Sequence, residues 1–280
     1  MTVLAVLQST TAYFTKREIE SPRLNAEHLL AHSLGLKRIE LYMEFERELT
    51  EAELAPLRQL VRRRGQGEPL QHLLGTVEFC GRSFACDKRA LIPRPETEEL
   101  IEILLAEIGP REAERRVLDV GTGSGVIALS LAAAWPHAQV QALDISEEAL
   151  ALARENAARL ALTERVQFFR SDLLAEVKGT FDLIVANLPY VPAADRATLS
   201  REVLHDPPQA LFGGADGEEV IRRLSAAAPP NLAPGGMLAL EIGIGQTDAL
   251  AASLAEQNYH HITARQDFAG VTRFLLSRYG

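Results

Sequence analysis

The sequence predicts an α/β fold that follows a smaller helical segment. Over residues 95–280, short apolar stretches of strand length alternate with longer stretches of helical periodicity. This alternation is typical of a parallel sheet covered by helices on both faces. Over residues 1–64, apolar residues recur at helical spacing only. We therefore divide the chain into a helical domain at 1–64, a linker at 65–94 and an α/β domain at 95–280.

Length and composition are those of an ordinary globular protein. The 280 residues are 47% hydrophobic and 24% charged, with 38 acidic and 29 basic side chains and a formal net charge of −9. This length accommodates one large or two modest domains that each bury a core. The acidic balance disfavours a partner bound mainly through phosphate groups, because such binding usually requires an excess of Lys and Arg.

We expect neither a membrane span nor a secretory signal. The longest apolar run, Val126 to Trp135, is about half of the roughly 20 residues that a span needs. The N-terminal stretch lacks a basic segment ahead of its apolar residues and a small-residue cleavage site. The two cysteines, Cys80 and Cys86, match no zinc-ligand spacing. The simplest setting is therefore the reducing cytoplasm.

The helical domain ends near a basic run. Thr50 and Glu53 form a capping box ahead of a helix with apolar residues at helical spacing. We interpret the run Arg62–Arg64 as a solvated helix end, with contact to an acidic surface of a partner as the alternative. His28 and His32 share one helix face at a spacing that zinc sites use, but no third ligand is evident, so we predict no metal there.

Glycine and proline residues interrupt the helical pattern from position 65 onward. Val77–Phe79 and Ser83–Cys86 are short stretches of strand-forming residues on either side of Gly81. They predict a β-hairpin, which we place in the linker between the two domains.

Helix and strand signals then alternate through the α/β domain. Pro95 is a favoured first helical residue and is followed by acidic residues in the first turn. Ser146 caps the clearest later helix. The last two strands are joined through Gly270 without a helix, which predicts an antiparallel pair closing an otherwise parallel sheet. The predicted strands are Arg116–Val120, Gln139–Asp144, Val166–Arg170, Phe181–Ala186, Met237–Glu241, His261–Ala264 and Thr272–Leu276.

A glycine-rich loop follows the first of these strands. The segment V-L-D-V-G-T-G-S-G runs from strand into helix, where glycines let a ligand approach bare backbone. Val126 stands where a dinucleotide fingerprint has its third glycine, which weakens a pyrophosphate-binding interpretation. A tight turn without a ligand is the alternative. The candidate cofactor-binding residues here are Gly121, Thr122, Gly123, Ser124 and Gly125.

The next strand ends in Asp144, about 20 residues beyond the glycines, where a carboxylate can accept both hydroxyls of an adenosine ribose. The alternative role, an N-cap of the following helix, suits Ser146 better. Loop and acid together resemble the S-adenosylmethionine site of Rossmann-like methyltransferases. The resemblance implies that Leu173 is an apolar wall beside the adenine and Asp172 a polar contact, unless both are ordinary strand-end residues.

The fourth strand delivers the segment Asn187-Leu188-Pro189-Tyr190 at its carboxyl end. It resembles the N-P-P-Y motif of methyltransferases that act on planar nitrogens such as side-chain amides. Leu188 replaces the first proline of that motif, which removes a rigid ring but keeps the backbone carbonyl. The alternative is a strand that simply ends in a proline turn. We take all four residues as candidate catalytic residues, with Asn187 also beside the cofactor.

The chemistry expected of this motif is orientation. An amide nitrogen is a poor nucleophile because its lone pair is delocalised into the carbonyl. The Asn187 side-chain oxygen and the Leu188 carbonyl can accept its two N–H groups and aim the nitrogen at a methyl group. Tyr190 would stack on the planar amide.

A further motif indicates which kind of planar nitrogen is the substrate, because methyltransferases with this tetrapeptide act on several. Leu91 to Glu98 reads L-I-P-R-P-E-T-E and closely resembles the signature of the HemK/PrmC family, the peptide chain release factor glutamine methyltransferases. The resemblance spans nearly the whole chain, including the helical domain. Further matching segments are Gly67–Gln71, Phe79–Gly81, Gly213–Gly217 and Asp267–Gly270.

This resemblance implies a fold, a reaction and a partner. The fold is a Rossmann-like class I S-adenosylmethionine-dependent methyltransferase sheet with a helical substrate-docking domain and a hairpin linker. The reaction methylates the glutamine of the Gly-Gly-Gln motif of class 1 release factors at its side-chain amide nitrogen, in the cytoplasm and without direct nucleic-acid binding. Arg94, Glu96 and Thr97 would close a segment beside the active site, although first-turn helix chemistry explains Glu96 and Thr97 equally well.

Two other functions remain open at this stage. An adenine amino-group methyltransferase would use the same tetrapeptide, but it needs a basic groove and base-flipping loops that are not visible here. A non-catalytic binding protein could keep the fold while Leu188 disables the motif.

Overall fold

The structure, a computed structural model, describes residues 1–108 and 113–280. Its contacts divide the chain into two units. The helical unit comprises Met1–Thr76 and Ser200–His205, and the sheet unit comprises Val77–Leu199 and Asp206–Gly280. The division at residue 76 falls inside the predicted linker. The inclusion of residues 200–205 in the helical unit has no counterpart in the sequence pattern.

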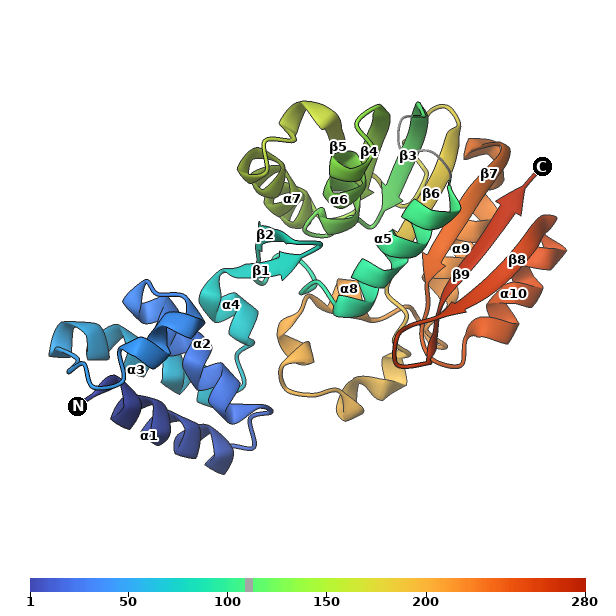
Figure 1. The fold of residues 1–280 in the computed structure, drawn as a ribbon. Helices are drawn as coiled ribbons and strands as arrows, with labels where there is room; N and C mark the ends of the chain where they lie inside the picture. Colours follow the sequence, from blue (N-terminus) through green and yellow to red (C-terminus); the bar gives the residue numbers. More distant parts are fainter. Residues whose placement is uncertain (109–112) are drawn as a thin grey trace. The chain divides into compact units, whose positions relative to one another are not determined.

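Side-chain caps begin two helices of the helical unit, α1 and α3. The Thr2 hydroxyl accepts a hydrogen bond from the backbone N–H of Ala5 (3.3 Å), which satisfies one of the free donors at the start of α1. The predicted capping box is confirmed, because the Glu53 carboxylate accepts from the Thr50 backbone N–H at 2.9 Å. The elements are α1 Val3–Lys16, α2 Pro22–Leu34, the 3₁₀ helix Arg38–Met43, α3 Glu51–Gly65 and α4 Leu70–Leu74 (Figure 1).

The apolar faces of these helices form one core. Phe14 of α1, Leu29 and Leu30 of α2 and Leu57 of α3 are all buried in it. Burying each such side chain contributes about 1.5–3 kcal/mol, so this core is the main source of stability for the helical unit.

The basic run at the end of α3 is only partly solvated, which corrects the interpretation from sequence. Arg62 and Arg63 are exposed, but the side chain of Arg64 is 2% exposed. Its Nε donates to the Asn25 side-chain oxygen at 2.7 Å, and its guanidinium also donates to the Glu68 carbonyl and pairs with Glu202. Arg64 is therefore a structural residue that binds the returning segment 200–205 within the helical unit.

Replacing Arg64 with Met should destabilise α2 and α3. The methionine keeps much of the apolar stem but leaves the Asn25 oxygen and the Glu68 carbonyl without their donor, so we expect a loss of about 2–3 kcal/mol. Native-state hydrogen exchange of the α2 and α3 amides measures this loss locally. The exposed neighbour provides the control, and Arg62→Met should change the same amides by less than about 0.5 kcal/mol. Equal protection in both variants would contradict a structural role for Arg64.

The predicted hairpin is confirmed as strands β1 (Thr76–Phe79) and β2 (Arg82–Ala85). Gly81 has a φ of +68°, a conformation that favours glycine in the connecting turn. Phe79 and Phe84 meet edge to face with ring centroids 6.0 Å apart, and both are buried in the core of the sheet unit. The hairpin is therefore packed on the sheet unit rather than forming a free linker.

The predicted mixed sheet is also confirmed. Within the described residues it has seven strands, of which β9 pairs antiparallel with β7 and with β8, while the other pairs are parallel (Figure 1). In spatial order the strands are β5 Val166–Arg170, β4 Ala138–Asp144, β3 Arg115–Val120, β6 Phe181–Asn187, β7 Leu232–Glu241, β9 Thr272–Tyr279 and β8 Tyr259–Gln266.

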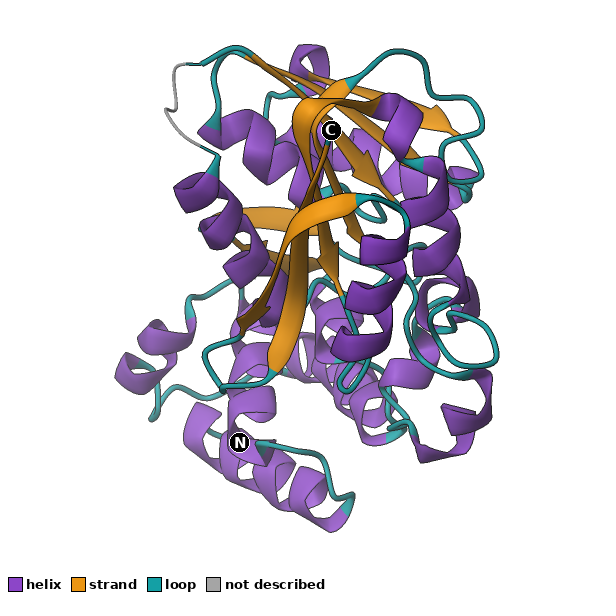
Figure 2. Cartoon of the chain, turned by 90° about the vertical axis from the view of Figure 1, so that its right-hand side faces the viewer, coloured by secondary structure: helices purple, strands orange, loops and turns teal. Residues whose placement is uncertain are grey.

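Alternation along the strands separates two apolar layers. Leu183 and Val185 of β6 face a core shared with α5 and α6, whereas Ile184 and Ala186 face a core shared with α9 and α10. Helices thus lie on both faces of the sheet (Figure 2). The helices are α5 Pro95–Glu107, α6 Val126–Ala134, α7 Glu147–Arg159, α8 Pro208–Leu211, α9 Glu219–Ala227 and α10 Thr247–Glu256, with 3₁₀ turns at Thr163–Arg165, Ala193–Thr198, Val203–His205 and Pro229–Asn231.

The strand order reverses at β3. From this strand the chain continues to β4 and β5 on one side and then returns to β6 on the other. Open α/β sheets bind ligands outside the carboxyl ends of strands at such a point. The glycine loop follows β3 and Asn187 ends β6, so both predicted motifs lie at the reversal. Within residues 1–108 and 113–280, no helix combines the length and apolar character needed to cross a membrane.

Candidate active site

A cavity of about 340 Å³ lies at the carboxyl ends of the central strands. Its walls come from the glycine loop after β3, from the ends of β4, β5 and β6, and from the segments around residues 89–97 and 207–212 of the sheet unit. Its lining is predominantly apolar with polar groups at a few points, as is usual for sites that bind small molecules.

The glycine loop forms one wall and is attached to β4. The backbone N–H groups of Gly121 and Thr122 both donate to the Leu143 carbonyl at 2.9 Å, and the N–H of Gly123 donates to the Asp144 carboxylate at 2.9 Å. Gly121, Thr122, Gly123 and Ser124 line the cavity, as expected of a cofactor-binding loop.

Gly125, the fifth predicted residue of the loop, is not part of this lining. It has a φ of +85° and caps α6. A methyl group placed on it would lie 3.1 Å from Leu129 and 3.2 Å from Ala153. The geometry therefore gives Gly125 a packing function, since only glycine allows α6 and α7 to approach this closely.

Asp119, in β3 just before the glycine loop, holds this loop through hydrogen bonds to its carboxylate. This side chain is fully buried, and its Oδ2 accepts from the Thr122 hydroxyl at 2.6 Å and from the Ala128 backbone N–H at 3.1 Å. Burial raises the pKa of the carboxyl to about 7, although both hydrogen bonds favour the ionised form. Asp119 stands inside the quoted glycine segment, but sequence reasoning assigned it no function.

Asp144 lines the cavity at the end of β4. Its two oxygens accept hydrogen bonds at 2.9 Å from the backbone N–H groups of Ser146 and Gly123. Burial raises the pKa of this carboxyl, and the backbone hydrogen bonds oppose that shift. Ser146 caps α7 by accepting from the Ala149 N–H, as predicted. A carboxylate has about four acceptor sites, so Asp144 can accept a further donor besides the backbone N–H groups of Gly123, Ser146 and Ile145.

The end of β5 forms an adjoining wall. Ser171, Asp172 and Leu173 all line the cavity. Leu173 supplies apolar surface, while both Asp172 oxygens accept from the Arg223 guanidinium at 2.9 and 3.0 Å. Leu173 thus lines the cavity, while its expected place beside an adenine stays a prediction, and Asp172 has an exposed ion-pair partner.

The tetrapeptide after β6 contributes three of its four residues. Asn187, Leu188 and Pro189 line the cavity, but Tyr190 does not. The Tyr190 ring packs against the core shared with α9 and α10, its carbonyl accepts from Gln246 at 3.0 Å, and burial raises the pKa of its hydroxyl. The structure therefore gives no direct support to a stacking role for this ring.

Leu188, the departure from the family motif, touches the glycine loop. Its side chain is 5% exposed, and a methyl group placed on Gly121 would lie 2.8 Å from its Cδ2. The substituted residue thus fills the space between the loop and the tetrapeptide.

Two buried residues, Thr97 in the cavity lining and its hydrogen-bond partner Glu241, were not identified as a pair from the sequence. Thr97 at the start of α5 and Glu241 at the end of β7 are 2% and 1% exposed. The Thr97 hydroxyl donates to the Glu241 carboxylate at 2.7 Å and accepts from the Asn187 side-chain nitrogen at 3.1 Å. The sequence signal that could have identified Glu241 is a glutamate at the end of an otherwise apolar predicted strand, a position where a charged residue is uncommon.

An ion pair and a backbone hydrogen bond, both to Asp206, hold the segment before α5. Arg94 pairs with Asp206 at 2.6 Å, and the other oxygen of Asp206 accepts from the Ile92 N–H at 3.2 Å. Arg94 and Thr97 line the cavity, and Glu96 does not. The expected closing segment thus lies beside the cavity, with Thr97 directed at Asn187 rather than serving only the first helical turn.

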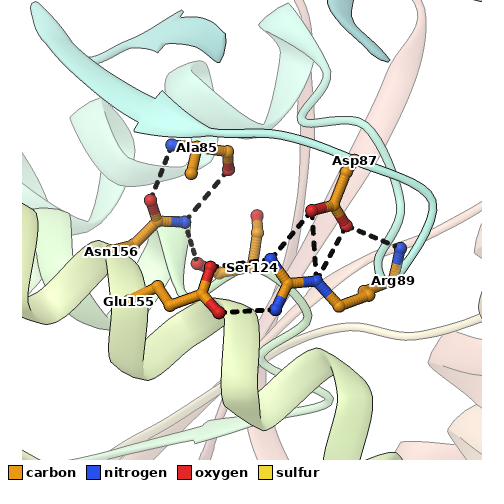
Figure 3. Close-up of polar contacts among 6 residues, drawn as sticks. All are labelled: Ala85, Asp87, Arg89, Ser124, Glu155 and Asn156. Carbon is orange, nitrogen blue, oxygen red and sulfur yellow. Dashed lines mark hydrogen bonds and ion pairs between the residues drawn. The ribbon is translucent and has the colours of Figure 1, made fainter. Parts of the chain in front are cut away.

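Figure 3 shows how α7 ties the hairpin to the glycine loop. The buried Asn156 side chain accepts from the Ala85 N–H at 2.6 Å, and it donates to the carbonyls of Ala85 (3.2 Å) and Ser124 (2.9 Å). Beside it, Arg89 pairs with both Glu155 and Asp87, and these bonds raise the pKa of Arg89.

Comparisons with known proteins bear on the fold and the family of the chain. The family model of the PrmC N-terminal domain matches residues 5–75, and the model of the Methyltransferase small domain matches residues 97–221. The catalytic domain of hMettl16 superposes with a TM-score of 0.58 at 15% identity, covering 82% of this chain and 83% of that chain. A T. thermophilus 16S rRNA N2 G1207 methyltransferase gives 0.53 at 20% identity, with 73% and 50% covered. Both likenesses show the fold alone.

Fold and site define a Rossmann-like methyltransferase of class I. The release factor glutamine methyltransferase of Deinococcus radiodurans is 45% identical over 274 residues, which cover 98% of this chain and 97% of that protein. The protein of the same name from Geobacter sulfurreducens is 42% identical, with 100% and 97% covered. The chain belongs to the release factor glutamine methyltransferase family.

The contact between Gly121 and Leu188 can be tested by a double-mutant cycle. Gly121 has a φ of +74°, so Gly121→Ala should cost about 1–2 kcal/mol in backbone strain and about 1–3 kcal/mol in crowding against Leu188. In the Leu188→Ala background the crowding should disappear while the strain remains. Urea unfolding of the four proteins measures the coupling. Additive effects of the two substitutions would contradict this contact.

Proposed function

We propose that the chain transfers a methyl group from S-adenosylmethionine to the side-chain amide nitrogen of the glutamine in the Gly-Gly-Gln motif of class 1 release factors. One observation carries the proposal. Asn187 ends β6, and it lines the same cavity as Leu188, the glycine loop and the acidic end of β4. The chain also belongs to this family. Methyl donor and planar amide can therefore meet across one space.

The proposed catalysis rests on orientation. The substrate amide lacks nucleophilicity because its lone pair is delocalised, so its nitrogen must be held in line with the departing sulfur. The Asn187 Oδ1 and the Leu188 carbonyl would accept its two N–H groups, which become more acidic as the nitrogen gains a bond. Fixed acceptors of this kind stabilise the developing positive charge without reorganising.

The cofactor fits the residues present. Bare backbone at Gly121 and Gly123 would admit the methionine portion, Asp144 would accept the ribose hydroxyls, and Leu173 would pack on the adenine. The bound cofactor supplies an electrophilic methyl group on a sulfonium. Thr122, Ser124 and Asn187 complete the proposed contacts, whereas Gly125 would act through helix packing.

The partner is a protein. We propose release factors as the substrate. We propose no direct nucleic-acid binding, because the chain carries a net charge of −9. Because release factors act in the cytoplasm and the thiols of Cys80 and Cys86 are free, we place the reaction there. The helical unit, which the PrmC N-terminal domain model matches, would dock the substrate, and this role stays a prediction.

The direct test is mass spectrometry of the Gly-Gly-Gln peptide after incubation of the full chain with S-adenosylmethionine and purified release factor. We expect a gain of one methyl group on the glutamine side chain. A parallel incubation with DNA tests the adenine alternative, and methylation of DNA but not of release factor would refute the proposal.

Replacing Asn187 with Ala should lower single-turnover methylation of release factor by about 10² or more. This is the scale expected when one preorganised polar contact to a transition state is lost. Affinity for S-adenosylmethionine should change less. Asn231→Ala, an asparagine outside the cavity lining, is the matched control and should keep turnover within about twofold of the unmodified chain. Similar rates for Asn187→Ala and the control would refute the proposed orientation.

Replacing Asp144 with Ala should instead weaken cofactor binding. The loss of a charged acceptor for the ribose corresponds to about 1–3 kcal/mol, or roughly 5- to 150-fold in Kd. Calorimetry with S-adenosylmethionine measures this change, with the exposed Asp248→Ala as the control. An unchanged Kd in Asp144→Ala would remove this residue from the proposed site.

A further inference from the structure

Three side chains from separate elements meet beside the proposed amide site. Asn187 ends β6 and Glu241 ends β7, and the two residues are register partners in adjacent parallel strands. Their side chains therefore point to the same face of the sheet, which is the face that α5 covers. Thr97 in the first turn of α5 lies between them, bonded to Glu241 at 2.7 Å and to Asn187 at 3.1 Å.

Proton counting fixes the direction of these two bonds. The Thr97 hydroxyl has a single proton, and an ionised Glu241 can only accept, so that proton must go to the carboxylate. The Thr97 oxygen then has only lone pairs to offer Asn187. Its partner must be the Nδ2 donor of the asparagine, because Oδ1 would meet another lone pair.

This chain of bonds decides which end of the asparagine amide is presented to a substrate. With Nδ2 held by Thr97, the other end, Oδ1, is the one left to accept a substrate N–H. An amide turned by 180° would present an N–H to another N–H and would repel the substrate. The two ends have nearly the same shape, so packing alone cannot distinguish them.

We propose that Thr97 and Glu241 are positioning residues that hold the Asn187 amide with its oxygen toward the glutamine substrate. This inference rests on the proposed function and extends it to two residues that do not touch the reacting atoms. It makes turnover depend on the ionisation of a carboxylate one step removed from the substrate.

The surroundings of Glu241 place its ionisation within the working pH range. Burial and, to a lesser extent, the negative charge of Glu96 raise its pKa to about 7, while the hydrogen bonds from Thr97 and Asn187 and the charge of Arg273 oppose that rise. The charged and titratable groups that face this carboxyl are Glu96 in the first turn of α5, Tyr190 after β6 and Arg273 on β9. Arg94 in turn faces Tyr190.

The sign of the pH effect follows from the bond directions. Above a pH of about 7 the carboxylate is ionised and the Asn187 oxygen faces the substrate. As the pH falls below this value, a protonated Glu241 can donate to Thr97, whose hydroxyl is then free to donate to the Asn187 Oδ1. Both amide orientations become accessible, so turnover should fall with decreasing pH.

Variants of the full chain separate this role from simple packing. Thr97→Val keeps the shape without the hydroxyl and should lower kcat for release factor methylation by about tenfold or more. Thr97→Ser keeps the hydroxyl and should restore most of the turnover that the valine loses. Glu241→Gln can donate as well as accept, so it should lower kcat about tenfold and abolish the fall in kcat between pH 8 and pH 6. The KM for S-adenosylmethionine should stay within about threefold throughout.

A second measurement does not depend on catalysis. In the ¹⁵N-labelled protein, the Asn187 side-chain amide signal, assigned by its absence in Asn187→Ala, should titrate with a midpoint near pH 7. That titration should disappear in Glu241→Gln. If the unmodified chain methylates no release factor yet the amide titrates, the proposed function fails and the positioning stands. If methylation proceeds but Thr97→Val retains full kcat, or Glu241→Gln keeps the pH dependence, the positioning is refuted alone.

Discussion

The attachment of the glycine loop to the end of β4 is the interaction on which the rest of the site depends. Three consecutive backbone N–H groups, from Gly121 to Gly123, are used in this attachment, two on the Leu143 carbonyl and one on the Asp144 carboxylate. These bonds set the distance between the loop and the acid. Because the loop is held through its backbone, its surface toward the cavity stays free of bulky side chains.

Buried polar groups hold the remaining walls through hydrogen bonds between elements. Asn156 satisfies the hairpin and the loop together, Asp119 secures Thr122, and Glu241 accepts from Thr97. A buried polar group costs about 1–3 kcal/mol when its partner is missing, so such groups specify one arrangement of the walls. The site is thus positioned less by the apolar core than by a few hydrogen bonds between elements distant in sequence.

The chain between β6 and α8 belongs to two units. It leaves the sheet unit after Leu199, contributes residues 200–205 to the helical unit, where Glu202 pairs with the buried Arg64, and returns at Asp206, which binds Arg94. Two arginine–carboxylate pairs, at Glu202 and at Asp206, therefore hold the later part of the segment that follows the tetrapeptide. Such pairs are directional, so they restrain a stretch that has little regular structure of its own.

The helices, the strands and the two motifs could be predicted from the sequence, because they depend on local properties. Short apolar runs predict the strands, and capping residues such as Thr50 and Ser146 predict helix starts. The glycine loop follows one of these strands, and Asp144 and Asn187 each end one. The tertiary structure alone decided which of these side chains meet. Glu241 lies near Asn187 because β7 lies beside β6 in one register. Arg64 is buried among Asn25, Glu68 and the returning residue Glu202. Gly125 and Tyr190 face packed elements rather than the cavity. Strand order, register and long-range returns of the chain arise from contacts between residues far apart in sequence, so no local pattern contains them.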